Sequence, residues 1–598
     1  MSLLQKASII TTPTAYAEDY LYSIKPAYAL GSELVTNGNY SNGTTSWDAT
    51  RNATLTASNN VLTVASDSST YGGAARQVVT VVVGKKYKWE FTINEANDTR
   101  VGIRNGTADF SSGAIILDIN DLGVGTHTYT FKATATSVSI ILGTMTLSGQ
   151  EKYSNVSLKE ITDADFDFDR NSTGTRVNED YLIETVATNT PRIDYTNGEP
   201  SILLEPSRTN LVLKSNDISN GGGNALSNLQ INSSNNLSPE GINNAQEIEV
   251  TSASQPKVES VAVSNATLYA VSGYVKKVTG DFFGLGFYQG DIGNQYAKFN
   301  LDTGTFVAVQ SNGVTSQSAT NIYNCEIIAY KNNWYRITCN ILTGSDASKS
   351  NFKWMAMSES AFNSGVVGDK FLIYGRQAEQ ASYATSLIHT SGSTVTRSAD
   401  VSNNAGNSDL INSTEGVVYA EIKALGDDGT NRGLGVSDGT VANRVNILFT
   451  TSSTTLRGFI NVGSVVVADF STNRFNILEF HKIAIKYKAN DCSFYIDGRE
   501  ISIDTSSTMP SANTLNEAQF DVGAGVLDFY GYTKSFIVFK EALTDLELEK
   551  LTGYNNHELY MNYYNRLSYL GLAEEYNVES DINNYILWSQ VYYKYQVL

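Results

Sequence analysis

Short runs in which apolar and polar residues alternate recur along most of the chain, and Gly or Asn separates one run from the next. A period of two residues turns one face of an extended segment toward a core and the other toward water, which is the pattern of a half-buried β-strand. Residues 76–93 show the pattern on both sides of Gly84, and residues 127–145 repeat it. We therefore expect an all-β chain whose strands pack as sandwiches.

The length and composition fit several such units. At about 150 residues per domain, 598 residues predict about four domains, because a single core stops growing well below this size. Charged residues make up only 17% of the chain, and there are 47 Gly but only 8 Pro. This composition is typical of many short strands joined by polar turns.

These patterns divide the chain into six parts. They are an extended N-terminal arm at 1–30, a β-sandwich at 31–161, connector strands and turns at 162–206, a second β-sandwich of the same plan at 207–396, a third β-sandwich at 397–555 and a helical, Tyr-rich C-terminal segment at 556–598. In the third sandwich, Asp497-Gly498 between alternating runs predicts a hairpin. Thr544, Glu547 and Gly553 predict one short helix with a capping box and a glycine stop.

The two ends of the chain lack the alternating pattern. The arm carries nine large apolar side chains but no period that could bury them, so we expect it to lie on a partner surface. These side chains are Leu3, Leu4, Ile9, Ile10, Tyr16, Tyr20, Leu21, Tyr22 and Ile24. In the C-terminal segment, Leu559, Tyr563, Leu567 and Leu570 stand at helical spacing, which suits either packing on the third sandwich or a contact between subunits.

Four aspartates alternate with apolar residues in DADFDFDRNSTGTRVN, residues 163–178. On a strand, Asp163, Asp165, Asp167 and Asp169 would share one face, about 6.6 Å apart. The positions at which an EF-hand loop needs Gly and Glu hold other residues, so no calcium loop is predicted. A glycosidase pair fits the spacing but needs one buried, protonated carboxyl. Four aspartates beside a hydroxyl-rich turn favour an ordinary exposed strand face.

The other motifs give no catalytic or metal site. GVSDG at 435–439 matches the G-x-S-x-G elbow, but that motif needs a helix after the Ser and a strand-like run follows here. His127, His389, His481 and His557 have no metal-ligand spacing, and no glycine-rich nucleotide motif occurs. We predict no catalytic, metal-binding or cofactor-binding residue and no cofactor, and no motif indicates a structural calcium ion.

The tryptophans and cysteines are candidates for structural roles. Trp47, Trp89, Trp334 and Trp354 suit either stacking on sugar rings or anchoring a core. The alternating run around Trp334 favours the core, the other three stay open, and no carbohydrate-binding residue is assigned.

Two of the three cysteines, Cys325 and Cys339, flank a predicted hairpin. The apolar faces of the two strands meet only if the numbers of each pair of opposed residues add up to an even number. This register sets Cys325 opposite Cys339. We interpret both as small buried apolar residues, because a protein made in the cytosol is normally reduced.

Charge and hydropathy exclude several partners. The net charge is −19 and no basic stripe offsets it, so binding to nucleic acid is not expected. No run approaches 18 apolar residues, which excludes membrane insertion by a helix, and the first residues lack the apolar core of a signal peptide.

Two long stretches carry a family resemblance. RNSTGTRVNEDYLIETVATNTPRIDYTNGEPSILLEPSRTNLV at 170–212 and QAEQASYATSLIHTSGSTVTRSADV at 377–401 resemble signatures of virion appendage proteins of tailed bacteriophages. The first two sandwiches are similar to carbohydrate-binding modules. HKIAIKYKANDCSFYIDGREI and ALTDLELEKL make the third similar to a laminin-G or concanavalin-type lectin domain. Tyr181 departs from the pattern, since Gly is expected in that turn.

The resemblance implies a structural virion protein, a tail or head fibre that is made in the host cytoplasm, lies on the virion surface and binds host-surface glycans. It also implies a homotrimer and contacts with other virion proteins through residues 1–30. The E-x-D-x-x-E strand of concanavalin-type glucanases is absent, so the resemblance argues against an enzyme. The alternatives are a glycan depolymerase and an architectural decoration protein without a ligand.

Overall fold

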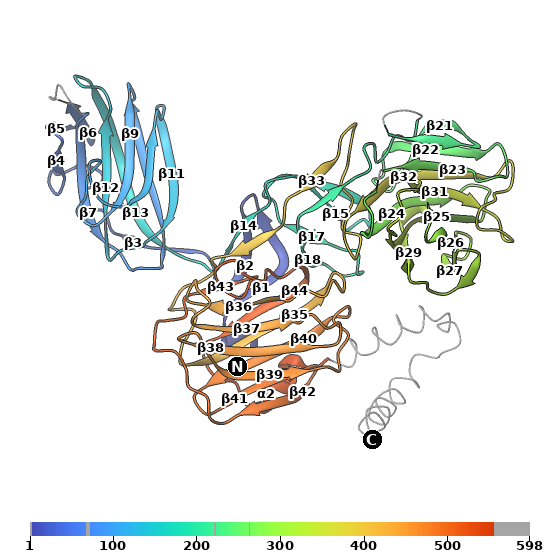
Figure 1. Ribbon diagram of the computed structural model, residues 1–598. Coiled ribbons are helices and arrows are strands. Elements are labelled where there is room, and N and C mark those ends of the chain that lie inside the picture. The colour runs from blue at the N-terminus through green and yellow to red at the C-terminus, as the bar shows by residue number, and fades with distance from the viewer. Residues whose placement is uncertain (1–2, 67–71, 220–222, 262, 555–598) are drawn as a thin grey trace.

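The structure is a computed structural model that describes residues 3–66, 72–219, 223–261 and 263–554. These residues are arranged almost wholly in antiparallel β-strands that form three sandwiches (Figure 1). The predicted multidomain, all-β fold class is thereby confirmed. The helical, Tyr-rich segment predicted at 556–598 lies outside the described residues.

The first sandwich, blue to cyan in Figure 1, pairs a five-stranded sheet with a six-stranded sheet. The first sheet has the order β10 (Ile115–Asn120), β9 (Thr99–Asn105), β12 (Ser137–Thr144), β7 (Ala74–Thr80), β4 (Asp48–Thr50). The second has the order β11 (Gly125–Lys132), β8 (Lys86–Glu95), β13 (Gln150–Thr162), β6 (Val61–Ser66), β5 (Ala53–Ser58), and β3 (Ala29–Glu33) also pairs with β13. In β8 the alternation places Tyr87, Trp89, Phe91 and Ile93 in the core.

The second sandwich, green to yellow in Figure 1, repeats this strand order and extends it. One sheet has the order β20 (Ala225–Ser227), β23 (Lys257–Ser260), β31 (Phe352–Met357), β25 (Phe282–Gln289), β26 (Gly293–Asn300), β27 (Thr305–Ser311), β28 (Val314–Ser316). The other has the order β21 (Leu229–Leu237), β22 (Asn243–Val250), β32 (Lys370–Glu379), β24 (Leu268–Lys277), β30 (Trp334–Leu342), β29 (Ile322–Tyr330). Strand β29 is therefore an edge strand.

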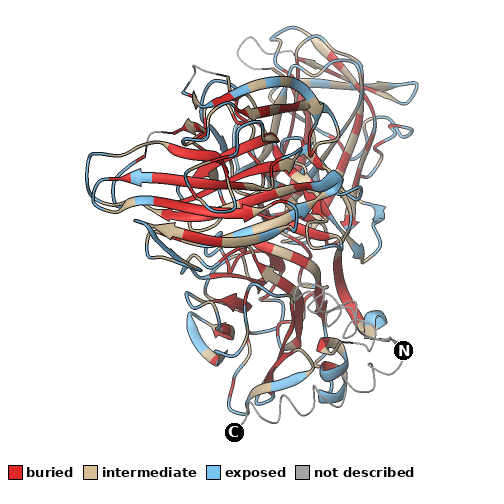
Figure 2. Ribbon diagram, turned by 90° about the vertical axis from the view of Figure 1, so that its right-hand side faces the viewer, coloured by how far each residue is buried: buried red, intermediate tan, exposed pale blue. Residues whose placement is uncertain are grey.

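The third sandwich takes its strands from distant parts of the chain. Its larger sheet has the order β34 (Val401–Asn403), β14 (Phe166–Asp169), β2 (Tyr20–Lys25), β1 (Ala7–Ala17), β44 (Gly531–Phe539), β35 (Glu415–Ala424), β40 (His481–Lys488), β41 (Cys492–Ile496), β42 (Arg499–Asp504). β18 (Ser201–Leu204) joins this sheet through β44 and also pairs with β17 (Arg192–Asp194). The smaller sheet has the order β39 (Val465–Thr472), β38 (Leu456–Val462), β37 (Arg444–Phe449), β36 (Arg432–Ser437), β43 (Glu517–Gln519). Figure 2 shows that buried residues follow the strands, whereas exposed residues gather in the turns.

The N-terminal segment is extended, as predicted, but its partner surface belongs to this chain. Strand β1 pairs with β44, where Ile10 lies opposite Ile537, and β2 pairs with β1 and β14. Ile9 and Leu21 are 0% exposed in the core of the third sandwich. The prediction that these apolar side chains need a separate partner is therefore wrong. Strand β1 has no local period, but it pairs with β44, more than 500 residues away in the same chain.

The connector is likewise folded into its neighbours. β14 and β18 belong to the sheet of the third sandwich, while β15 (Gly174–Val177) and β16 (Ile183–Val186) form a separate hairpin. A short ladder of β19 (Arg208–Asn210) with β33 (Val395–Arg397) joins the two ends of the second sandwich. The connector is thus a structured junction, held against both the second and the third sandwich.

Local predictions in the third sandwich are confirmed. Asp497 and Gly498 have positive φ angles and turn β41 into β42. Thr544 accepts a hydrogen bond from the Glu547 amide, the Glu547 side chain accepts one from the Thr544 amide, and α2 (Asp545–Thr552) ends before Gly553. The described chain has one further short α-helix, α1 (Leu3–Lys6), and neither of the two is long and apolar enough to cross a bilayer.

Candidate functional site

Three of the four alternating connector aspartates, Asp163, Asp165 and Asp167, lie at a joint between sandwiches, whereas Asp169 is exposed. The Ser23 amide donates to Asp165 Oδ1 at 2.8 Å, and Lys86 Nζ lies 3.9 Å from Asp163 and 3.6 Å from Asp167. Burial raises the pKa of Asp165 to about 6 and also raises the pKa of Asp163. We expected this strand face to be solvated, but Asp163, Asp165 and Asp167 are half-buried, because the first sandwich places Lys86 against them.

The G-x-S-x-G match is a turn between strands, as predicted. Ser437 ends β36 and is fully buried, and β37 follows after a short turn. His481 lies on β40 in the other sheet, where Nδ1 is 2.7 Å from Asp497 Oδ2 and Nε2 is 2.9 Å from the Asn476 carbonyl oxygen. No Ser–His pair forms here.

The remaining histidines and the tryptophans also occupy structural positions. His389 pairs with Glu240 at 2.7 Å, His127 bonds the Gly123 carbonyl, and His557 lies outside the described residues. Four tryptophans are buried, with exposed fractions of 6% or less, and stacking of a sugar on them is therefore excluded. They are Trp47, Trp89, Trp334 and Trp354.

Another aspartate with a raised pKa lies in the third sandwich. Burial raises the pKa of Asp521 to about 6, and the charges of Asp528 and Glu517 add to the shift. Asp521 is only 2% exposed and accepts a hydrogen bond from the Gly523 amide at 2.6 Å, so a substrate could not reach it directly. Throughout the described ranges, no three His, Cys, Asp or Glu side chains are grouped in a way that could hold a metal ion.

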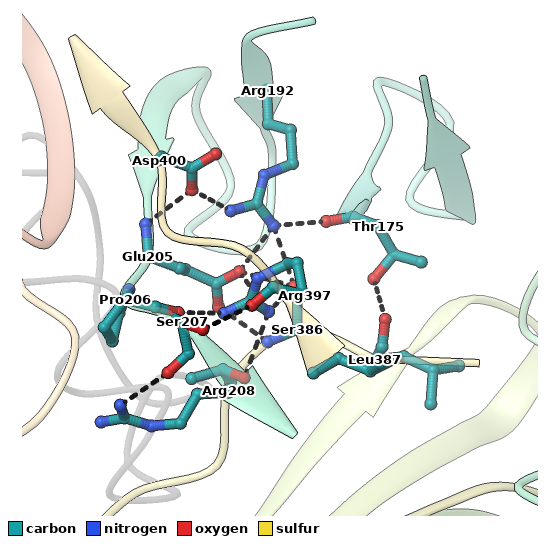
Figure 3. Close-up of polar contacts among 12 residues, drawn as sticks. Thr175, Arg192, Glu205, Pro206, Ser207, Arg208, Ser386, Leu387, Arg397 and Asp400 are labelled. Atoms are coloured by element: carbon teal, nitrogen blue, oxygen red, sulfur yellow. Dashed lines mark hydrogen bonds and ion pairs between the residues drawn. The ribbon is translucent and has the colours of Figure 1, made fainter. Parts of the chain in front are cut away.

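A buried ionic cluster joins the connector to the second and third sandwiches. We call it the ionic lock, and it comprises Arg170, Arg192, Arg397, Glu205 and Asp400. Figure 3 shows Arg192, Arg397, Glu205 and Asp400. Arg192 Nη1 lies 2.5 Å from Glu205 Oε2 and its Nη2 bonds Asp400, whose other carboxylate oxygen is 3.1 Å from Arg170. Arg397 is 2.9 Å from Glu205. All five side chains are 3% exposed or less.

Further hydrogen bonds reach the lock from neighbouring groups, although Nε of both Arg192 and Arg397 is buried without a partner. Arg397 donates to the Pro206 carbonyl at 2.8 Å, and Arg192 donates to the Thr175 carbonyl at 3.0 Å. Ser386 donates to Glu205 through both its amide and its hydroxyl. Burial alone would raise the pKa of Glu205, but Arg397 and Arg192 outweigh it and lower the pKa to about 2. The carboxylate is therefore charged, and the cluster acts as a fixed joint.

The lock connects the two sequence stretches at 170–212 and 377–401. Arg170, Arg192 and Glu205 come from the first stretch, whereas Ser386, Arg397 and Asp400 come from the second. Sequence reasoning missed these residues as a site. One signal of buried charges was present in the sequence: Arg192 and Glu205 stand beside apolar residues in PRID at 191–194 and LLEP at 203–206.

A pocket lies beside the lock, between the connector and the second sandwich. Its volume is about 310 Å³, and we call it the junction pocket. It is lined by Val177, Tyr181, Thr196, Ile328, Ala329, Tyr330 and Lys331. The walls continue from the lock, because β15 carries both Thr175 and Val177 and β17 carries both Arg192 and Asp194.

Buried contacts hold the walls of the junction pocket in place. Asp194 accepts hydrogen bonds from the Val177 and Thr196 amides, each at 2.8 Å. Tyr330 packs edge-to-face on Tyr274 with ring centroids 5.1 Å apart. The pocket is thus a preformed feature of the junction.

Tyr181 is the unusual residue of the junction pocket. Its φ angle is 58°, in the left-handed region that a bulky side chain rarely adopts. The residue is 46% exposed, and its hydroxyl donates to the Gly198 carbonyl at 3.1 Å. Asp180 and Lys331 face each other at 3.7 Å beside it. Residues in such backbone conformations cluster at functional sites, so Tyr181 makes the junction pocket a candidate binding site.

No protein-family model matches the chain, and no curated protein matches its sequence. Solved structures similar to it include the CBM40 module of the Ruminococcus gnavus IT-sialidase bound to α2,3-sialyllactose, at 15% identity and a TM-score of 0.21, covering 24% of this chain and 84% of that one. The CBM22 tandem of Paenibacillus barcinonensis Xyn10C is similar at 9% identity and a TM-score of 0.23, covering 59% and 98%. Domains LG4-5 of the mouse laminin α1 chain follow at 8% identity and 0.17, covering 57% and 94%.

At these identities and TM-scores the comparisons describe likeness only. The sandwich fold assigned above stands on the strand order of the chain itself.

Proposed function

We propose that this chain is a structural, glycan-binding appendage protein of a virion, with its binding site in the junction pocket. The observation that carries the binding half is Tyr181, an exposed ring held at φ 58° at the pocket rim. An aromatic face packs against the apolar face of a sugar ring. Asp180, Lys331 and Thr196 supply charged and hydroxyl groups for the sugar hydroxyls.

The size of the junction pocket limits its ligand. Small-molecule sites usually enclose about 300–1,000 Å³. At about 310 Å³ the junction pocket is at the lower end, so we assign it a terminal sugar of a surface glycan and not a long polysaccharide segment.

The ionic lock supports the structural half of the proposal. It fixes the connector between two sandwiches with five charged groups from distant parts of the chain. A fixed spacing of modules suits a protein that presents binding sites at a surface.

The sequence resemblance supports the placement on a virion and the homotrimer. We locate the contact with other virion proteins on apolar side chains that stay exposed near the N-terminus, because Ile9 and Leu21 of the same segment are already buried in the third sandwich. These side chains are Leu4, Ile24, Tyr28 and Leu30, with exposed fractions of 40% or more. Immunogold labelling of particles tests the placement, and label that stays with the soluble fraction would contradict it.

The proposal includes no hydrolysis of glycans. Two observations support a protein that binds glycans without cleaving them. The E-x-D-x-x-E strand of the glucanases is absent from the sequence, and Asp521, whose pKa is raised by burial, is only 2% exposed and so out of reach of a substrate. The competing function is a glycan depolymerase. Release of reducing ends from host polysaccharide by the purified chain would favour that enzyme over the binding protein.

The substitution Tyr181→Gly tests the binding site. Glycine suits φ 58° better than tyrosine, so the variant should fold at least as stably as the wild type while losing the ring. We expect at least a tenfold loss of affinity for glycans that the wild type binds on an array or by calorimetry. Asn189→Gly, at φ 54° in the same connector, is the matched control and should bind normally.

Equal binding by Tyr181→Gly and the wild type would remove the junction pocket from the proposal. No glycan binding by the wild type, together with normal particle labelling, would leave the architectural alternative.

A further inference from the structure

Two thiols of the second sandwich face each other across neighbouring strands. Strands β29 and β30 pair in the predicted register from Glu326 opposite Thr338 to Tyr330 opposite Trp334. The register shifts before Tyr323 pairs with Asn340, so Asn324 and Cys325 together face Cys339 across a β-bulge, in place of the direct Cys325–Cys339 pair that the sequence predicts. Asn324 has a φ angle of 48° in this bulge.

The two side chains lie on the same face of the sheet. Cys339 is fully buried in the core of the second sandwich, and Cys325 packs against that core from its edge. Burial raises the pKa of the Cys339 thiol, and contact with Cys325 raises it further. Both cysteines are free thiols in this structure.

The two thiols are in contact, which is the first requirement of a disulfide. Disulfides span Cα separations of about 4.4–6.8 Å, and facing positions on paired antiparallel strands lie about 4.5–5.5 Å apart. The bulge leaves the ladder from Glu326 to Tyr330 intact, so a bridge requires no change in that pairing.

The two thiols differ in access to solvent. Strand β29 is the edge of its sheet and Cys325 is half-buried there, whereas Cys339 is 0% exposed on β30. A small oxidant would reach Cys325 first, and Cys339 would serve as the resolving thiol.

We propose that Cys325 and Cys339 form a reversible redox staple that fastens edge strand β29 to β30. The Cys325 thiolate attacks a small-molecule disulfide of the glutathione class, forms a mixed disulfide and releases one small thiol. The Cys339 thiolate then attacks the Cys325 sulfur, forms the intramolecular disulfide and releases the second small thiol. Two protein thiols and one small disulfide thus become one protein disulfide and two small thiols.

The staple has a defined structural consequence. Strand β29 also carries Ile328, Ala329 and Tyr330, which form one wall of the junction pocket. Oxidation should therefore slow local opening of this wall, because a covalent link removes the fraying freedom of an edge strand.

The third cysteine provides an internal control. Cys492 is 1% exposed on β41 in the third sandwich, and its Sγ atom contacts the Lys488 carbonyl and Ser507 Oγ, with no cysteine beside it. It should stay reduced under the same treatment.

The test treats the full chain with oxidised glutathione at pH 8 and counts free thiols after denaturation. The count should fall from three to one and return to three with dithiothreitol, and peptide mapping should find the Cys325–Cys339 cross-link. Cys492→Ser should fall from two thiols to none, whereas Cys325→Ser should keep both of its thiols. Amide exchange in 322–330 should slow on oxidation.

Three results would overturn the staple: an unchanged thiol count, a stable glutathione adduct on Cys325 without a cross-link, or a bridge between two chains. Mapping of the wild-type chain decides among these even where a serine variant does not fold.

Discussion

The third sandwich is joined to the first and to the second in different ways. The first sandwich meets it through ion pairs in which one partner is open to solvent, such as Lys85 with Asp409 at 2.6 Å and Lys132 with Glu517 at 3.2 Å. The Asp409 side chain is 65% exposed. The second sandwich meets it through the ionic lock, whose side chains are 3% exposed or less. The same types of charge thus make two joints with different strengths.

Burial decides that strength. An exposed ion pair contributes about 0–1 kcal/mol, because water and salt screen the charges. Removing one partner of a buried pair costs about 3–5 kcal/mol, because the other charge stays behind without water. We therefore expect the second sandwich to be fixed on the third and the first to be the more easily displaced (Figure 1).

The largest expected loss of stability comes from removing β1 and β2, which complete the larger sheet of the third sandwich. Deleting residues 1–25 removes β1 and β2, and with them the buried Ile9, Ile10 and Leu21. Each of these side chains stabilises the fold by about 1.5–3 kcal/mol, so the loss rivals the 5–15 kcal/mol of a typical domain. Calorimetry should show that the transition of the third sandwich is lost.

Deleting only residues 1–6 is the control for this truncation. It removes α1 and the Lys6–Glu547 pair but leaves β1, and should lower the melting temperature only slightly. If the longer deletion melts like the full chain, the pairing of β1 with β44 does not stabilise the sandwich.

The second prediction contrasts the two joints directly. Arg192→Met leaves Glu205 and Asp400 partly unpaired in the lock and should cost about 3–5 kcal/mol in urea unfolding. Asp409→Asn breaks the pair with Lys85, which keeps its second pair with Glu160, and should cost less than about 1 kcal/mol. In 1 M salt the effect of Asp409→Asn should vanish, while that of Arg192→Met persists. Similar costs for both variants would mean that burial does not distinguish the joints.

The sequence predicted those features that depend on neighbouring residues. Alternation located the strands, Asp497-Gly498 predicted a hairpin and Thr544 with Glu547 predicted a capped helix, because each depends on a few adjacent residues. The register from Glu326 to Tyr330 was predictable for the same reason, since both strands belong to one hairpin, but the bulge at Asn324 and Cys325 was not.

Features built from distant segments were not predictable. Nothing near Ile10 indicates a partner strand at Ile537, so the sequence predicts an extended arm where the structure has β1. Arg192 and Asp400 resemble surface charges until the fold buries them together. The junction pocket has walls from the connector and from β29, and its one sign in the sequence was Tyr181 in place of Gly.

The smallest expected effect concerns the half-buried Asp165, at the joint between the first and the third sandwich. Its folded pKa, about 6, lies above the usual value because burial disfavours the carboxylate. A raised pKa means that the folded chain binds the proton more tightly, so stability from this group is full below about pH 4 and is lost as pH rises through about 6. Asp165→Asn removes the charge and keeps an oxygen that can accept from the Ser23 amide. It should therefore stabilise the chain at pH 8 by about 1 kcal/mol after solvent screening, and leave it unchanged at pH 4. Thermal melts at the two pH values check this, with the exposed Asp169→Asn as control; a stabilisation that is equal at both would show that the Asp165 carboxylate is not strained by its burial.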